Sequence, residues 1–206
     1  MKVSIVKYNA GNIFSVINAV KRLGIEPLWT DNPEELITSD RVIFPGQGEA
    51  SNAMEYLQQH NLDKVIKDLK QPVLGICIGQ QLLCKHSEEG DTDCLGIFPI
   101  QVKKFKPVLH EQKVPQMGWN SLHFITENCG STQSGISPLF KGLKENDFVY
   151  FVHSYYCELC ENTIATTDYI LPYSAALQKD NFYAAQFHPE KSGNVGAQIL
   201  KNFIDL

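Results

Sequence analysis

A cysteine between two glycines, placed directly after an apolar run, is the feature that most limits how this chain can fold. The run covers residues 73–76, Cys77 lies between Gly75 and Gly79, and residues 78–83 favour the start of an amphipathic helix. A strand that turns tightly into a helix exposes the side chain at the turn and needs glycine where backbones come close. The helix N-terminus favours the thiolate form of such a cysteine. The pattern predicts a nucleophile elbow, although most free cysteines are buried and inert.

Strand-like and helix-like segments alternate along the first part of the chain. Apolar runs predict strands at residues 2–6, 27–30, 41–44 and 73–76. Helical spacing and capping signals predict a helix at 13–23 that stops at Gly24, a short helix that begins at Asn32, and a longer helix at 50–69 with a break near Asn61. This alternation is typical of a parallel, doubly wound sheet.

The second half of the chain has β-rich runs and little helical period. Strands in mixed or antiparallel pairing are expected at 97–105, 119–124, 148–156, 163–170, 174–177 and 182–187, followed by a helix at 193–206. The polar stretch 126–137 predicts a surface loop. We therefore predict one α/β domain over residues 1–206, with an open, mostly parallel sheet flanked by helices and an antiparallel β extension in the second half.

The composition excludes several classes of protein. The chain has 206 residues and a net charge of −5, so it offers no electrostatic attraction for nucleic acid or an anionic membrane. No apolar run approaches the roughly 20 residues of a membrane-spanning helix. Residues 1–7 become polar too soon for a signal peptide. We expect a cytoplasmic protein whose partners are neither nucleic acids nor membranes.

Six cysteines occur at positions 77, 84, 94, 129, 157 and 160. Because nothing indicates export, their even number does not predict disulfides. Cys157 and Cys160 have CxxC spacing, but no second pair and no histidine pair accompany them, as a zinc site would require. We interpret them as two unrelated thiols in a loop. The glycine motifs that bind nucleotide phosphates are also missing, so we expect neither a metal nor a cofactor.

A second segment that ends a predicted strand carries His188 and Glu190, on either side of Pro189. In an open α/β sheet, ligands bind outside the carboxyl ends of the strands, where Cys77 is also expected. A cysteine nucleophile needs a base, and a carboxylate can fix the tautomer of that base. Cys77, His188 and Glu190 would therefore make a chemically complete triad. The alternative is a surface histidine and glutamate with unrelated roles.

A third segment, Pro45-Gly46-Gln47-Gly48, ends the predicted strand at 41–44. It is either an ordinary glycine turn or one wall of an oxyanion hole. In the second case, backbone N–H groups near Gly46 and Gln47, together with that of Ile78, would hold the negative charge that develops during acyl transfer.

These motifs resemble those of the class I, or triad, glutamine amidotransferases. The resemblance covers nearly the whole chain and includes the elbow, Ser87-Glu-Glu-Gly90 and Gln186-Phe-His-Pro-Glu-Lys-Ser-Gly193. It implies the fold of that family and hydrolysis of L-glutamine to glutamate and ammonia. In that reaction Cys77 would be the nucleophile, His188 the base and Glu190 the residue that orients it. The positions that match glutamine-holding residues of the family are Gly46, Gln81, Glu89, Ser154 and Tyr155.

Within the family, segments 117–120, 151–155 and 188–193 resemble the glutaminase subunits of imidazole glycerol phosphate synthases. That resemblance implies a heterodimer with a (β/α)₈-barrel cyclase subunit. The cyclase would use the ammonia to make imidazole glycerol phosphate and an aminoimidazole carboxamide ribotide in histidine biosynthesis. Tyr150 and Lys191 match positions near the interface and the ammonia passage, and Trp119 is a further candidate for the interface.

The chain departs from the usual motifs of that subfamily at Lys7, Ala10, Gln47 and Gln116, and none of these changes removes a catalytic group. Two alternatives stay open. One is a glutaminase subunit of a paralogous amidotransferase, for surface-sugar amidine, anthranilate or aminobenzoate synthesis, although segments 115–120 and 150–156 argue against the last two. The other is a non-catalytic binding subunit with the same fold, against which the intact triad argues.

Overall fold

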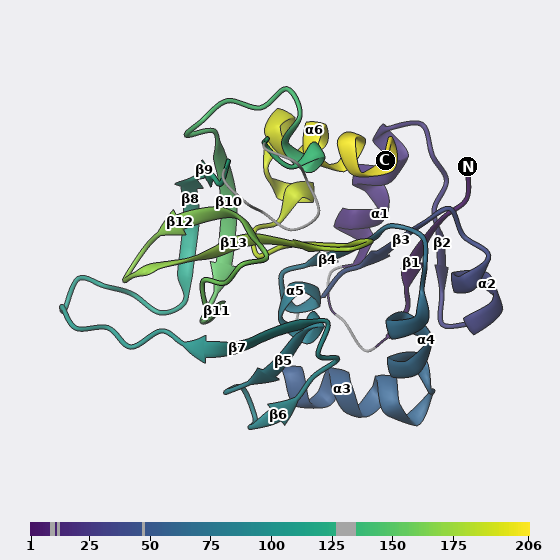
Figure 1. Ribbon diagram of the computed structural model, residues 1–206, viewed down its shortest axis with the longest axis horizontal. Coiled ribbons are helices and arrows are strands. Elements are labelled where there is room, and N and C mark those ends of the chain that lie inside the picture. The colour runs from purple at the N-terminus through teal and green to yellow at the C-terminus, as the bar shows by residue number, and fades with distance from the viewer. Residues whose placement is uncertain (9–10, 12, 47, 127–134) are drawn as a thin grey trace.

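Within the part of the chain that the structure describes, the main sheet has eight strands, and the Cys77 turn follows one of its central strands (Figure 1). The computed structural model describes residues 1–8, 11, 13–46, 48–126 and 135–206. Five neighbouring strands are parallel, in the order β2 (Leu28–Thr30), β1 (Val3–Val6), β3 (Arg41–Phe44), β4 (Val73–Ile76) and β14 (Phe182–Ala185). The sheet continues with antiparallel β13 (Pro172–Lys179), β12 (Thr163–Asp168) and β9 (His123–Phe124). The predicted fold class is confirmed.

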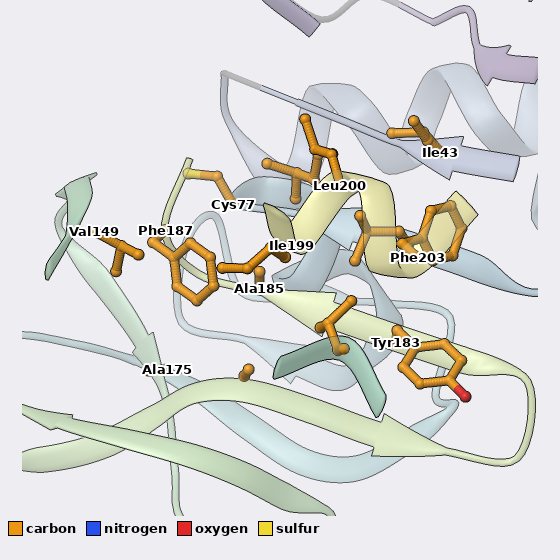
Figure 2. Packing of buried hydrophobic residues seen from close by; sticks show 14 of the residues in the cluster. Ile43, Cys77, Val149, Ala175, Tyr183, Ala185, Phe187, Ile199, Leu200 and Phe203 are labelled. Carbon is orange, nitrogen blue, oxygen red and sulfur yellow. The ribbon is translucent and has the colours of Figure 1, made fainter. Parts of the chain in front are cut away.

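Helices cover both faces of the parallel strands (Figure 1). One core contains residues of α1 (Ile13–Arg22) and α6 (Gly193–Ile204), and the other contains residues of α2 (Pro33–Ile37), α3 (Ala50–Gln59), α4 (Leu62–Asp68) and α5 (Ile78–Leu83). Successive strand residues enter opposite cores, so Ile43 belongs to the first and Phe44 to the second. Figure 2 shows Ile199, Leu200 and Phe203 of α6 in the first core, close to β14.

Local signals explain where the helices begin and end. The Asn32 side chain accepts hydrogen bonds from the backbone N–H groups of Glu34 and Glu35, which caps α2. Gly24, at φ +84°, follows α1, and Asn61, at φ +55°, separates α3 from α4, as predicted. Among the described residues, none of the helices has the length and apolar character that crossing a bilayer requires.

Within the described residues, strands between positions 84 and 157 form two smaller sheets. An antiparallel pair joins β8 (Gln116–Ser121) to β10 (Phe148–His153). A four-stranded sheet has the order β11 (Tyr155–Cys157), β7 (Phe98–Lys104), β5 (Cys84–Ser87) and β6 (Thr92–Asp93). The 3₁₀ turns η1 (Pro138–Phe140) and η2 (Pro189–Lys191) precede α6. The strands β10 and β11 together replace the single run predicted at 148–156.

Two local predictions were wrong. Helix α5 is not amphipathic, because all six of its residues are buried and β5 follows it directly. Cys157 lies in β11 rather than in a loop, and its sulfur is 3.5 Å from the sulfur of Cys84, so it packs against another thiol. Cys129 and most of the loop predicted at 126–137 lie outside the described residues.

The elbow depends on two glycines, because backbones come close on both sides of Cys77. A Cβ at Gly75 would lie 2.8 Å from the carbonyl oxygen of Gly79, and a Cβ at Gly79 would lie 1.9 Å from the carbonyl oxygen of Phe44. The second contact joins α5 to the end of β3, the strand that leads into residues 45–48. The sequence prediction that a side chain would clash at both glycines is confirmed.

The substitution Gly79→Ala tests this contact. In an isolated helix, alanine is about 1 kcal/mol more stabilising than glycine. Here we expect the clash with the Phe44 carbonyl to outweigh that gain and to lower the free energy of unfolding by about 2–3 kcal/mol. Urea denaturation measures the change. The control is Gly24→Ala, which meets no atom within 4 Å but must adopt φ +84°. A smaller loss for Gly79→Ala than for the control would contradict the prediction.

Candidate active site

Cys77 lies between β4 and α5 in a backbone conformation that L-residues rarely adopt. Its φ is +54° and its ψ is −108°, and such a conformation costs about 1–3 kcal/mol. Its backbone N–H donates a 2.7 Å hydrogen bond to the carbonyl of Ala185 at the end of the neighbouring parallel strand. This bond and the close packing of Gly79 hold the strained turn in place.

His188 and Glu190 form a buried pair on the turn that follows β14. The imidazole Nδ1 of His188 and the carboxylate Oε1 of Glu190 are 2.8 Å apart, and each side chain is only 2% exposed. A carboxylate can only accept, so Nδ1 carries the proton in this bond. The backbone is fixed as well, because the N–H of His188 donates to the carbonyl of Tyr150 at 2.9 Å and the hydroxyl of Ser192 donates to the carbonyl of His188 at 2.6 Å.

The charges around His188 favour its protonated form. Burial alone would lower its pKa, but the negative charge of the Cys77 thiolate, the proximity of that sulfur and the Glu190 carboxylate together raise the pKa to about 10. The other ring nitrogen, Nε2, is buried and has no hydrogen-bond partner within the described part of the chain. The geometry therefore supports an imidazolium at His188, between the Cys77 sulfur and the Glu190 carboxylate.

Cys77 opens onto a cavity of about 450 Å³. Most of the predicted glutamine-holding and interface residues line it, namely Gln81, Glu89, Ser154, Tyr155, Tyr150 and Lys191. The Glu89 carboxylate accepts a 2.9 Å hydrogen bond from the backbone N–H of Ala50 at the start of α3. Partial burial and the nearby Glu49 nonetheless raise the pKa of Glu89 above its usual value. The cavity thus has a thiol at one wall and a carboxylate at another.

The residues predicted to form the oxyanion hole are only partly brought together. Ile78 lines the large cavity, whereas Gly46 borders a separate small cavity together with His188 and Glu190. Gly46 is tightly enclosed, since a Cβ there would lie 1.9 Å from Ile78 Cγ2 and 2.0 Å from the hydroxyl of Tyr8. That hydroxyl donates a hydrogen bond to the carbonyl of Pro45. Gln47 lies outside the described residues.

Trp119 lies outside the cavity but next to one of its walls. It pairs with Tyr150 across β8 and β10, and their ring centroids are 6.0 Å apart in an edge-to-face arrangement. The Trp119 side chain is 55% exposed, and Met117 on the same strand and Phe148 on the paired strand are also exposed. A group of exposed apolar side chains of this kind is a candidate surface for a protein contact. We call Met117, Trp119, Phe148 and Tyr150 the β8–β10 face.

Three residues at the site have no role predicted from the sequence. Gln186 is fully buried, and its side-chain amide nitrogen is 3.7 Å from the Cys77 sulfur. The carbonyl of Val152 is 4.0 Å from the same sulfur. His153 lines the cavity, and its burial lowers its pKa to about 4. The His188 charge also lowers this pKa, whereas the hydrogen bond to the Tyr155 carbonyl raises it. Only Gln186 gave a signal, as a polar residue at the end of an apolar run and two positions before His188.

A family model described as "Glutamine amidotransferase class-I" matches residues 5–206. The chain belongs to this family. The protein "Imidazole glycerol phosphate synthase subunit HisH" of Bacteroides thetaiotaomicron is 57% identical over 206 residues, which cover all of both chains. The protein of the same name from Yersinia pseudotuberculosis is 43% identical over 207 residues, again covering all of both chains. These relatives confirm the predicted resemblance to this subfamily and the prediction of an enzyme of this type.

A solved structure of a glutamine amidotransferase has the same fold. It aligns with a TM-score of 0.73 at 18% sequence identity, over 100% of this chain and 98% of the other. At this level of identity the likeness concerns the fold alone. It agrees with the mixed sheet described above.

The pKa of His188 tests the electrostatic arrangement directly. In Cys77→Ala the largest influence that raises this pKa is lost, while burial and Glu190 remain. We expect the pKa to fall from about 10 by more than one unit, because the largest contribution that raises it is removed. One pKa unit corresponds to about 1.4 kcal/mol of interaction. NMR titration of the imidazole C–H signals measures it, with Cys160→Ala as the control. An unchanged His188 pKa in Cys77→Ala would show that the sulfur and the imidazole do not interact.

Proposed function

We propose that this chain hydrolyses L-glutamine as the glutaminase subunit of an imidazole glycerol phosphate synthase. One observation carries the proposal: a buried His188–Glu190 pair at 2.8 Å lies beside a cysteine that opens onto a cavity. The relatives that share up to 57% of its residues have the name of a subunit of that synthase. We further propose that residues 1–206 act as one domain.

The reaction we propose passes through a covalent intermediate on Cys77. Its thiolate attacks the carboxamide carbon of glutamine, and the proton of the His188 imidazolium passes to the departing nitrogen, so ammonia leaves and a glutamyl thioester forms. His188, now neutral, takes a proton from water, which attacks the thioester and releases glutamate. Glu190 keeps the imidazole oriented and stabilises its charged form. The net change is glutamine plus water to glutamate plus ammonia.

Negative charge on the carbonyl oxygen needs donors during both steps. We propose the backbone N–H groups of Ile78, Gly46 and Gln47 for that role, since Ile78 N–H begins α5 directly after the nucleophile. The Tyr8 hydroxyl that bonds the Pro45 carbonyl would hold the start of the other segment in place.

We propose that the cavity holds glutamine with its carboxamide toward Cys77 and its charged end toward Glu89. A carboxylate that is half-buried and raised in pKa by burial gains from pairing with an ammonium group. Gln81, Ser154, Tyr155 and Gly46 are the other proposed contacts. The Gln81 side chain is already fixed by a 3.0 Å hydrogen bond to the Tyr155 carbonyl.

We propose a (β/α)₈-barrel cyclase subunit as the partner, docked on the β8–β10 face and near Lys191. Free ammonia would be lost to water, so a glutaminase gains by releasing it toward a second active site. Tyr150 lines the cavity and contacts the exposed Trp119, which supports a docking surface near the point of ammonia release. The cyclase would make imidazole glycerol phosphate and the aminoimidazole carboxamide ribotide of histidine biosynthesis.

We propose the cytoplasm as the place of action. The mechanism needs Cys77 as a free thiol, and the described cysteines are unpaired. Thiols stay reduced in the cytosol, where glutathione and thioredoxin maintain them.

The proposed function is tested by a synthesis assay with the co-expressed cyclase and its ribonucleotide substrate. We expect Cys77→Ala to abolish synthesis from glutamine and to leave synthesis from added ammonia intact, since only the source of ammonia is removed. The products are identified by mass spectrometry, and Cys94→Ala serves as the control that keeps both activities. Loss of both activities in folded Cys77→Ala would show a structural role. Products other than imidazole glycerol phosphate would show a paralogous pathway.

A further inference from the structure

Gln186 directly follows β14 and lies two residues before His188, and its backbone continues the hydrogen bonding of β14. Its N–H donates a 2.8 Å hydrogen bond to the carbonyl of Ala175 on β13. Its side chain is fully buried and reaches the nucleophilic sulfur, with 3.7 Å between Nε2 and Cys77 Sγ. A buried amide must satisfy its donors and acceptors inside the protein, so this contact is part of how the site is built.

The orientation of the Gln186 amide follows from its neighbours. The carbonyl oxygen of Tyr155 can only accept, so the Gln81 atom that lies 3.0 Å from it is the amide nitrogen. The same nitrogen lies 3.0 Å from the Gln186 side chain, which must therefore present its oxygen there. The other end of the Gln186 amide, its NH₂ group, is left to face Cys77. A backbone carbonyl thus determines, through two side chains, that a donor points at the sulfur.

A donor at this position favours one form of the cysteine over the other. An amide N–H can donate to a thiolate, and bonds to a charged acceptor are stronger than bonds to a neutral one. The Val152 carbonyl, 4.0 Å from the sulfur, favours the protonated thiol because it can accept from S–H. Gln186 opposes that preference. The other titratable groups that act on this sulfur are His188, Tyr8 and Tyr173, and burial keeps the two tyrosines neutral by raising the pKa of each.

We propose that Gln186 donates a hydrogen bond to the Cys77 thiolate, whose charge the nearby His188 imidazolium also stabilises, and that Gln81 holds the Gln186 amide in the orientation that this bond requires. This inference deepens the proposed function, since it assumes that Cys77 reacts as a thiolate. It also links the glutamine cavity to the nucleophile. Gln81 lines the cavity and holds both the Tyr155 carbonyl and Gln186, so a ligand that moves Gln81 also moves the donor at the sulfur.

The test is the pH profile of Cys77 alkylation by iodoacetamide in the isolated chain, followed on the Cys77 peptide by mass spectrometry. Gln186→Met keeps the length of the side chain and removes the donor. We expect the midpoint of its profile to move up by about one pH unit. At pH values below both midpoints, the alkylation rate then falls about tenfold. The matched control is Gln80→Met, because Gln80 is equally buried but its amide donates to the carbonyl of Ser174 at 3.0 Å. An unmoved midpoint, or an equal shift in the control, would overturn the proposal.

A second measurement needs no variant. In NMR spectra of the unmodified protein recorded against pH, the chemical shifts of the Gln186 side-chain N–H groups should change with the same midpoint as the alkylation profile. Those of Gln80 should stay constant. Signals of Gln186 that do not follow the ionisation of Cys77 would also overturn the proposal, even if Gln186→Met did not fold. Neither measurement uses glutamine turnover. The assignment of Gln186 can therefore fail while the proposed function stands, and loss of synthesis in the earlier assay leaves it untouched.

Discussion

The parallel pairing of β4 with β14 is the constraint on which the site depends. Ile76 lies opposite Ala185, and the N–H of Cys77 extends the ladder by donating to the Ala185 carbonyl at 2.7 Å. Residues that follow the two strands therefore emerge side by side, which brings Cys77 next to Gln186 and close to His188. A shift of this register by one residue would send the side chains of β14 to the opposite faces of the sheet. The amide of Gln186 would then turn away from the sulfur.

Burial makes the charged groups of the site depend on one another. The His188 and Glu190 side chains are almost completely enclosed, and an isolated charge in such a place costs several kcal/mol. The imidazolium is stable there because a carboxylate lies on one side and the sulfur on the other. Neutral dipoles complete the arrangement, since the Gln186 amide, the Val152 carbonyl and the helix N-terminus of α5 all act on the same sulfur. A change in the charge or position of one of these groups therefore changes the stability of the charged forms of the others.

Much of the fold could be predicted because local signals carry it. Apolar runs marked the parallel strands, Asn32 and Gly24 marked helix ends, and the glycines beside Cys77 marked the close approach at the elbow. The failures concern long-range packing. Helix α5 packs against β4, β5, α3 and β14, and all of its residues are buried. The four-stranded sheet brings Cys157 of β11 to Cys84 of β5. Neither is visible in a local pattern.

The proposed triad residues, Cys77, His188 and Glu190, could be picked out from the sequence because each belongs to a motif with its own chemistry. Gln186 could not be assigned, because its role depends on the register of β14 and on an amide orientation set by the Tyr155 carbonyl. The surroundings of Gly46 could not be predicted either, because it borders the small cavity that His188 and Glu190 also line. The contact geometry of Gly46 follows from the packing of Tyr8 and Ile78, which no sequence motif specifies.

We propose that the acyl group of glutamine passes through Cys77. To test this step, the complex of this chain and its cyclase is mixed with glutamine and quenched in acid within the first turnovers, and the cysteine peptides are examined by mass spectrometry. We expect a glutamyl thioester on the Cys77 peptide, and none when ammonia replaces glutamine. Consumption of glutamine without an adduct on Cys77, or with an adduct on Cys94 or Cys160 in its place, would contradict it.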